Sequence, residues 1–444
     1  MDSNVSRQRP DLVLLEYRPK RDYVEFDLRR IEMRDEVAND DRDAAPLAEA
    51  PHDVHDTYRC GPICAGVCVR HVAVSSMRTM GGPTDRCLSD LALLKSPDYA
   101  TFAIHNGGRL PYRIDTLVDS GFRLVFSDAS HRRPWSRRWP MSLLGRLGPL
   151  GGPFLDTLVQ WRAIRRAPLT LAMFESQGHV LAFARSFGPR RRNRRLVIIA
   201  CWLADIAPRL SARKRAIYRR MYRAVDLVIV FSSNQTAILT RELGIPPERI
   251  MVVPFGIDTD EFVDVSIQET GTVVAVGRDA GRDWGTFLKA VDGTGWDVKV
   301  ACRQRLLGDI PIPPEVEVLG YVDREHYRRL LANATVVVIS TEERAYPTGQ
   351  SVLLEAMAIG KPCVVTHTAA MADYAANGVN CLTVPVADAP ALCAAIARLL
   401  DDPILRERIG AGGTATVTST CNARAMWRTI GAAINDLDRG GNVS

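Results

Sequence analysis

The segment from Thr341 to Thr366, TEERAYPTGQSVLLEAMAIGKPCVVT, constrains the fold of this chain more than any other stretch. The apolar, β-branched run at residues 336–339 precedes it and is typical of a buried parallel strand. A turn-rich loop follows, and residues 351–359 predict a short helix that ends at Gly360, with Pro362 just beyond it. Residues 363–366 predict the next strand, so the segment is one strand–loop–helix–strand unit of a parallel sheet.

The predicted turn into this helix directs free backbone N–H groups and the positive end of the helix dipole toward one point. That point suits an anion, most often a phosphate. Glu355 lies one turn inside the predicted helix, where its carboxylate can accept hydrogen bonds from the hydroxyls of a sugar. The turn by itself is equally consistent with an ordinary connection between two strands.

Length and composition favour two folded domains. The chain has 444 residues, and hydrophobic residues make up 46% of them, which is enough for substantial cores. No window reaches the ~18 uninterrupted apolar residues of a membrane-spanning helix, and the first residues contain no apolar signal segment. The ten cysteines are scattered, as in reduced proteins, so we expect a cytoplasmic location.

Positive charge is concentrated in one part of the chain. Residues 129–223 contain 21 lysines and arginines against three acidic residues, whereas the rest of the chain contains 36 against 48. Arginines alternate with tryptophans over residues 132–143, and they cluster again at 190–195 and 209–223. We therefore expect an anionic partner, and this mixture suits a membrane surface at the inner face of the membrane. No nucleic-acid motif accompanies the charge, and a solvated basic face is the alternative.

Strands and helices alternate through the readable part of the chain. This alternation predicts α/β domains with doubly wound parallel sheets, whose ligands lie at the carboxyl ends of the strands. Residues 232–235, SSNQ, are predicted to cap the helix that follows the strand at 226–231. The predicted strands are residues 99–104, 124–126, 169–174, 196–200 and 226–231 in the first half, and 272–276, 297–301, 316–319, 336–339 and 363–366 in the second.

The sequence GQSVLLEAMAIGKPCVVT resembles the nucleotide-sugar signature of the retaining glycosyltransferases of family 4 (group 1). The resemblance implies the GT-B fold, in which two Rossmann-like domains face each other across a cleft. It implies that Glu355 binds the ribose of the donor. It also implies that the diphosphate and sugar are held by the amides of Gly349, Gln350, Ser351 and Val352.

The same resemblance assigns residues outside this signature. Arg278 and Arg282, in the loop after the strand at 272–276, would clamp the diphosphate, as arginine can do bidentately; two solvated loop arginines are the alternative. A glycine-rich loop of the first domain would face the donor through His105, Gly107 and Gly108, although His105 is equally consistent with a hydrogen-bonded loop histidine. The chain departs from the family at Pro347, where a second glutamate is usual eight positions before Glu355.

The resemblance also sets the expected domains. Residues 1–97 are the poorly readable N-terminal part of the first domain, with a mobile loop. Residues 98–265 form the Rossmann-like domain on the acceptor side, and residues 271–418 form the nucleotide-sugar-binding domain. Residues 419–444 would form a helix that crosses back to the first domain.

Two further groups in the first half are candidate functional residues. Glu175 and His179 are four residues apart and would share one face of a helix, where either could act on an acceptor hydroxyl. Helix capping and surface pairing are the alternative for both. Cys60, Cys64 and Cys68 have a spacing that matches no common metal site, so we expect this cluster to be metal-free.

The implied function is transfer of a sugar from a nucleotide-sugar donor to an acceptor hydroxyl, with retention of the anomeric configuration. The departing diphosphate would be stabilised by arginine and backbone N–H groups, without a metal or other cofactor. The acceptor is not identified by the sequence, and a lipid-linked or membrane-surface acceptor fits the basic segments. A sugar-nucleotide epimerase on the same fold and a non-catalytic GT-B scaffold are the alternatives.

Overall fold

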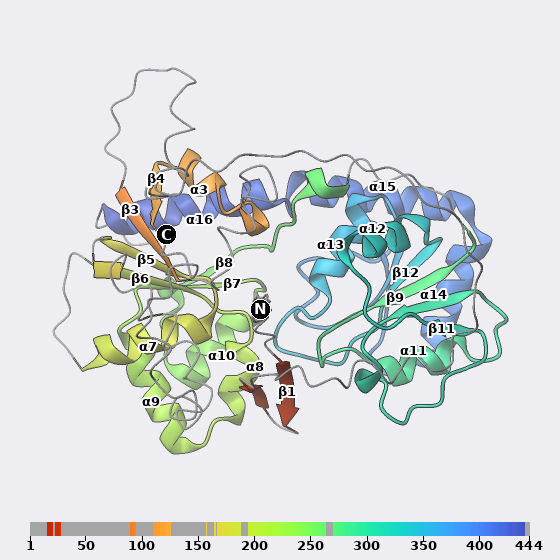
Figure 1. The fold of residues 1–444 in the computed structure, drawn as a ribbon, viewed down its shortest axis with the longest axis horizontal. Coiled ribbons are helices and arrows are strands. Elements are labelled where there is room, and N and C mark those ends of the chain that lie inside the picture. Colours follow the sequence, from red (N-terminus) through yellow and green to blue (C-terminus); the bar gives the residue numbers. More distant parts are fainter. Residues whose placement is uncertain are drawn as a thin grey trace, which may run out of the picture. The chain divides into compact units, whose positions relative to one another are not determined.

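The computed structural model describes residues 16–20, 23–27, 89–94, 110–125, 157, 164–165, 167–187, 194–262 and 270–439. The chain separates into two compact units, Met1–Arg86 and Cys87–Ser444. In the first unit, the described residues are an antiparallel pair of strands, β1 (Glu16–Lys20) and β2 (Tyr23–Asp27). All other described elements belong to the second unit (Figure 1).

The C-terminal half of the second unit is built on a six-stranded parallel sheet in the order β11-β10-β9-β12-β13-β14. Val273 of β9 pairs with Val298 on one side and with Val336 on the other, so the chain winds outward from β9 in both directions. This is the doubly wound arrangement that the alternating pattern predicted. The strands are β9 (Val273–Val276), β10 (Val298–Ala301), β11 (Val316–Val318), β12 (Val336–Ile339), β13 (Cys363–Thr366) and β14 (Leu382–Val384).

Both faces of this sheet are buried, which explains why its strands are apolar throughout rather than alternating. Val337 and Ile339 pack on one face, in the same cluster as residues of α12 (Arg324–Asn333) and α13 (Gln350–Ala358). Val336 and Val338 pack on the other face. That face is covered by α11 (Trp284–Val291) and α14 (Ala389–Asp401).

The N-terminal half of the second unit contains another six-stranded parallel sheet, in the order β4-β3-β5-β6-β7-β8. Its strand β3 was not expected, because it lies before residue 98, yet it pairs with both β4 and β5. The strand predicted at residues 99–104 lies outside the described residues. The strands are β3 (Ser89–Leu94), β4 (Phe122–Val125), β5 (Leu169–Ala172), β6 (Arg195–Ile199), β7 (Leu227–Val230) and β8 (Ile250–Val252).

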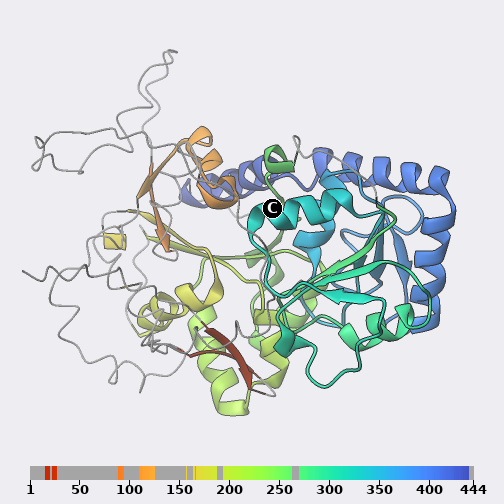
Figure 2. The same cartoon turned by 45° about the vertical axis from the view of Figure 1, so that its right-hand side comes forward.

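Helices cover both faces of this sheet as well. One face carries α7 (Glu175–Ser186) and α9 (Ala212–Arg223), with α10 (Asn234–Leu243) beside them. The other face carries α3 (Thr116–Asp119) and α16 (Ala423–Asp438), which is the last helix of the chain. The apolar stripe of α16 is part of the N-terminal core. Helix α15 (Pro403–Ser419) directly precedes α16 in the chain. Both views show the two helices following one another along one side of the unit (Figures 1 and 2).

The chain crosses between the two halves at two points that lie side by side. The Ile257 N–H donates to the Cys421 carbonyl at 3.1 Å, and the Ala423 N–H donates to the Ile257 carbonyl at 2.8 Å. Gly256 allows this approach, because a Cβ there would lie 2.3 Å from the carbonyl oxygen of Asn422. The two crossings therefore form one hydrogen-bonded connection. Within the described ranges, no helix is long and apolar enough to span a bilayer.

Candidate anion and sugar site

The loop between β12 and α13 ends at Gly349, whose φ of 83° is left-handed. A side chain there would also collide with its neighbours, because a Cβ would lie 2.6 Å from Arg282 Nη1 and 2.5 Å from Ile339 Cγ2. The helix begins at Gln350, one residue before the predicted start. Its first turn leaves the amides of Ser351 and Val352 without intrahelical acceptors, so the positive end of α13 can bind an anion.

Arg282 brings a buried positive charge to the same point. Its side chain is 4% exposed, and its Nε and Nη1 atoms have no hydrogen-bond partner among the described residues. The nearest acid is Asp279, whose Oδ2 lies 3.4 Å from Arg282 Nε. The other oxygen of Asp279 already accepts hydrogen bonds from the Gly281 N–H and the Thr348 hydroxyl. Buried N–H groups without acceptors are unfavourable, so this guanidinium is suited to a bound anion.

Arg278, the other member of the predicted pair, has different surroundings. Its side chain is exposed, and its guanidinium lies 4.8 Å from the centre of the Tyr321 ring. Its Nη2 donates to the Val322 carbonyl at 3.3 Å. The two arginines are therefore not equivalent: Arg282 lies under the turn into α13, whereas Arg278 rests on the loop that follows β11.

Glu355 of α13 already has partners on both carboxylate oxygens. Oε1 accepts from Arg324 Nη1 at 3.0 Å, and Oε2 accepts from the Tyr327 hydroxyl. Burial raises the pKa of Glu355, while Arg324 and the Tyr327 hydroxyl oppose this by stabilising the ionised form. Arg324 also pairs with Glu261 in the segment Thr259–Phe262, which follows the first crossing between the halves. Glu355, the candidate ribose-binding residue, is thus linked to that crossing through Arg324.

Tyr112, in the N-terminal half, interacts electrostatically with this carboxylate. Tyr112 and Arg113 both have a φ of 56°, a conformation that non-glycine residues rarely adopt. The backbone is held there because Trp427 Nε1 donates to the Tyr112 carbonyl at 2.6 Å and Arg113 Nη1 pairs with Asp260 at 2.9 Å. Partial desolvation and then the charge of Glu355 raise the pKa of Tyr112, although 53% of the residue is exposed. Strained residues of this kind cluster at functional sites.

Glu175 and His179 lie inside the N-terminal half and not on its surface. They do share the first half of α7, but both are buried and have partners within the N-terminal half. Glu175 accepts hydrogen bonds from the N–H groups of Cys201 and Trp202, at 3.0 and 2.8 Å, and burial raises its pKa. His179 Nε2 lies 3.1 Å from the Tyr222 hydroxyl, and burial lowers its pKa to about 4. Their burial contradicts the surface pairing that was the alternative, and an action of either residue on an acceptor stays a prediction.

The cap of α10 is also different from the prediction. Ser233 occupies the N-cap position, but its side chain makes no cap hydrogen bond. The Ser233 N–H and hydroxyl instead donate to the carboxylate of Asp373, at 2.6 and 2.9 Å, and Asp373 comes from the C-terminal half. Its observed partners lie in a contact between the two halves.

Several predicted site residues lie outside the described part of the chain, namely His105, Gly107, Gly108, Cys60, Cys64 and Cys68, as do the arginines over 132–143 and at 190–192. Conversely, the sequence analysis did not find Tyr112, Arg324 or Tyr327. Arg324 and Tyr327 are three residues apart on a helix capped by Asp323, which is a usable signal that they share a face. Nothing in the local sequence connects them with Glu355.

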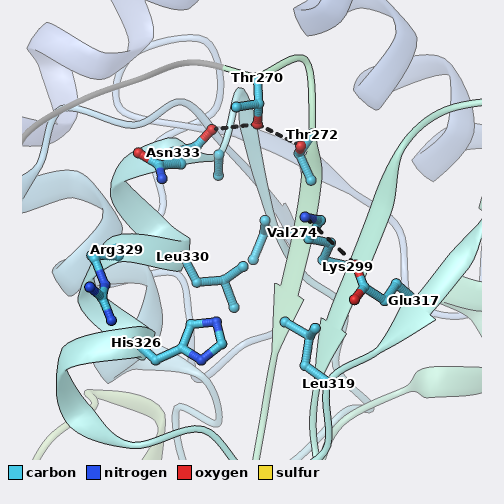
Figure 3. A pocket seen from close by; sticks show the side chains of 11 residues that line it. Thr270, Thr272, Val274, Lys299, Glu317, Leu319, His326, Arg329, Leu330 and Asn333 are labelled. Carbon is cyan, nitrogen blue, oxygen red and sulfur yellow. Dashed lines mark hydrogen bonds and ion pairs between the residues drawn. The ribbon is translucent and has the colours of Figure 1, made fainter. Parts of the chain in front are cut away.

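A groove of about 400 Å³ lies on another part of the C-terminal half, between α12 and strands β9 to β11 (Figure 3). The Lys299 ammonium and the Glu317 carboxylate pair at 3.6 Å along its strand side, and His326 faces them from α12. The groove contains neither Arg282 nor any residue of α13. The candidate anion site at the turn into α13 is therefore separate from this groove.

Two family models match separate parts of the chain. The family model for the group 1 glycosyltransferases matches residues 291–402, which include all of α13, and the model for Glycosyltransferase Family 4 matches residues 161–261. Each model covers about a quarter of the chain, so the chain is similar to glycosyltransferases over these two stretches. Its fold is GT-B, as the resemblance predicted, and solved structures of this fold align with most of it. Sucrose-phosphate synthase from Thermosynechococcus elongatus has a TM-score of 0.59 at 17% identity, covering 80% of this chain and 100% of that one.

HepE from Anabaena, solved with UDP and glucose, has a TM-score of 0.56 at 16% identity, and the match covers 79% of this chain and 100% of that one. The curated relatives match over shorter stretches. The MMP alpha-(1->4)-mannosyltransferase of Mycolicibacterium hassiacum is 25% identical over 209 residues, which are 44% of this chain and 50% of the relative. The lipopolysaccharide core glycosyltransferase LpsD of Rhizobium meliloti is 31% identical over 147 residues, 30% and 41% of the two chains. The chain thus spans about half the length of the curated relatives it matches.

Proposed function

We propose that this chain transfers a sugar from a nucleotide-sugar donor to an acceptor hydroxyl, with retention of the anomeric configuration and without a metal ion. The observation that carries the proposal is the buried, incompletely paired guanidinium of Arg282 beneath the positive end of α13. A nucleoside diphosphate is the anion that fits best, because Glu355 lies one turn further along the same helix. The solved complexes of HepE with UDP and with UDP-glucose support a nucleotide sugar as the donor.

The difficult part of such a reaction is the departure of the diphosphate, on which negative charge develops as the glycosidic bond breaks. Arg282 and the amides of Ser351 and Val352 are held in place before the reaction, so they stabilise this charge without reorganising. Removing one donor from such a site typically costs about 3–4 kcal/mol of transition-state stabilisation. These groups supply the positive charge that a metal ion would otherwise provide.

Retention is proposed to occur by attack from the face that the diphosphate leaves. The bond from the acceptor oxygen to the anomeric carbon forms as the bond to the diphosphate breaks, and the acceptor proton passes to a phosphate oxygen. A protein carboxylate is not assigned as nucleophile, since this chain has Pro347 at the position where the resembled family usually has its second glutamate. The nearest upstream acid, Glu343, is exposed, and its Oε1 accepts from the Ala369 N–H at 3.2 Å.

Glu355 is proposed to bind the ribose hydroxyls of the donor. A carboxylate has about four acceptor positions, so it can accept from a sugar hydroxyl while it keeps its bonds to Arg324 and Tyr327. In this arrangement Arg324 and Tyr327 orient Glu355 and keep it ionised. They are positioning residues rather than ligands.

The test is sugar transfer by Arg282→Gln, Arg278→Ala and Glu355→Ala, after a thermal-shift screen of UDP-, GDP- and ADP-sugars has identified the donor. Each folded variant should lose about 100-fold or more in turnover, and chelating agents should leave the wild type unaffected. Arg398→Ala is the matched control, because Arg398 is an exposed arginine of α14. Near-normal turnover of the site variants would remove the assignment.

The products distinguish this function from its alternatives. Conversion of the donor in the absence of any acceptor would favour a sugar-nucleotide epimerase on the same fold. Failure of every nucleotide sugar to bind the wild type would favour a non-catalytic scaffold. Inversion at the anomeric carbon would contradict the proposed stereochemistry without affecting the donor site.

A further inference from the structure

The outer surface of α7 and α9 exposes three large apolar side chains. Phe183 and Phe187 are 47% and 61% exposed, and Ile217 of α9 is 48% exposed. The two phenylalanine rings lie one helical turn apart and meet edge to face, with their centroids 4.9 Å apart. Apolar side chains that remain exposed next to one another mark a contact surface more often than isolated ones do.

Arginine joins the two helices at this surface. The Arg220 guanidinium lies 4.2 Å from the centre of the Phe187 ring, and its Nε donates to the Ser186 carbonyl at 3.3 Å. Ile217 and Arg213 precede Arg220 at helical spacings, so the three side chains follow one side of α9. Together, Phe183, Phe187, Arg213, Ile217 and Arg220 form what we call the α7–α9 patch.

The opposite side of α9 is used differently. Arg215 pairs with the Glu242 carboxylate of α10 at 3.2 Å, and Arg219 Nε donates to the Glu242 carbonyl at 2.9 Å. These contacts hold α9 against α10 and leave the α7 side of the helix to the patch. One side of α9 therefore contacts α10, and the other side carries the exposed side chains of the patch.

The neighbourhood of the patch is strongly positive. Six of the twelve residues of α9 are lysine or arginine, and the helix contains no acid. The nearby acids already have basic partners within the fold: Asp226 pairs with Arg185 at 2.9 Å and with Arg195 at 3.3 Å, and Glu242 pairs with Arg215 and Arg241. A partner with negative charge and an apolar interior would complement both the arginines and the exposed phenylalanines.

We propose that the α7–α9 patch docks on an anionic lipid bilayer. Arginines attract the anionic headgroups, while exposed aromatic and aliphatic tips insert at the boundary of the acyl chains. Nucleic acid would satisfy the arginines, but it does not require two phenylalanines packed against each other beside an isoleucine. The inference is independent of the donor site, since none of the patch residues belongs to it.

The experiment is sedimentation of the full chain with vesicles of phosphatidylcholine alone and with about 30% phosphatidylglycerol added. The wild type should bind only the anionic vesicles, and added salt should weaken the binding. The double variant F183S/F187S should bind at least about tenfold more weakly. Ile404→Ser is the matched control, because Ile404 is 79% exposed at the start of α15 and should be dispensable.

Several outcomes would overturn the proposal. These are equal binding to neutral and anionic vesicles, no vesicle binding at all, or anionic binding that F183S/F187S leaves unchanged while its thermal unfolding matches that of the wild type. An oligonucleotide that binds more tightly than the vesicles, with the same dependence on Phe183 and Phe187, would assign the patch to nucleic acid instead. Because the readout is binding alone, failure here leaves the proposed transfer reaction untouched.

Discussion

The guanidinium of Arg282 lies against the α-carbon of Gly349, so close that a Cβ on that glycine would stand 2.6 Å from Nη1. The contact joins the loop after β9 to the turn into α13. It brings a buried cation, whose acidic neighbour is Asp279 at 3.4 Å, to the positive end of a helix, and two positive charges so close together favour a bound anion. The candidate site is therefore defined by a pair of residues, one of which contributes charge and the other only space.

Gly349→Ala should destabilise the protein more than the same substitution at a left-handed glycine with free space around it. The new methyl group must displace Arg282 or Ile339 in addition to adopting a φ of 83°, so we expect a loss of about 2–4 kcal/mol in the free energy of unfolding. Gly378→Ala is the control, because its φ is 72° but nothing lies within 4 Å of its Cβ position. That variant should lose only about 1 kcal/mol. Chemical denaturation measures both, and equal losses would contradict the crowded contact.

Tyr327→Phe should shift the pH dependence of donor binding. The Tyr327 hydroxyl stabilises the ionised form of Glu355, whose pKa is already raised by burial, so its removal raises that pKa further. Binding that requires the carboxylate ion should then fail at a higher pH on acidification than it does in the wild type. Calorimetric titration with the donor nucleotide at several acidic pH values measures the pH at which the affinity falls. Tyr218→Phe, in the N-terminal half, is the control and should not change this pH. A shift of this pH to a lower value in Tyr327→Phe would exclude the mechanism.

Tyr112 should separate stability from activity. Tyr112→Gly and Tyr112→Ala both remove the phenol that interacts electrostatically with Glu355, and both should lower turnover at least about tenfold if this residue serves the site. Only glycine relieves the left-handed backbone, so Tyr112→Gly should be more stable than Tyr112→Ala by about 1 kcal/mol. Thermal unfolding and initial rates test the two effects separately. Normal turnover in both variants would show that Tyr112 is not part of the site.

His179 should make the protein less stable at acidic pH. Burial lowers its pKa to about 4 in the folded state, whereas an unfolded histidine titrates near 6.5. Between these values the unfolded chain binds a proton that the folded chain does not, so the free energy of unfolding falls as the pH falls. The full effect is about 3 kcal/mol. His179→Gln should flatten this slope relative to the wild type, whereas His326→Gln, at an exposed histidine of α12, should not; identical slopes in all three proteins would contradict the burial of a neutral imidazole.

The sequence by itself determined the local units of this protein. The apolar run at 336–339, the helix that carries Glu355 and the strand at 363–366 are all present in the structure close to their predicted bounds. Strand periodicity, helix termination at Gly360 and the turn chemistry before α13 act over windows of a few residues. For that reason the alternation of strands and helices, and from it the doubly wound sheet of the C-terminal half, could be predicted without coordinates.

Only the tertiary structure decided which side chains meet. His179 and Glu175 share a helix as the spacing indicated, yet the packing of α7 against the sheet turned both of them inward. The hydrogen bonds of Ser233 at the start of α10 go to Asp373, which is remote in the sequence. The partners of Glu355 come from α12 for the same reason. Burial and hydrogen-bond partners depend on residues that are distant along the chain and become neighbours only when the parallel strands pair, so no local pattern contains them.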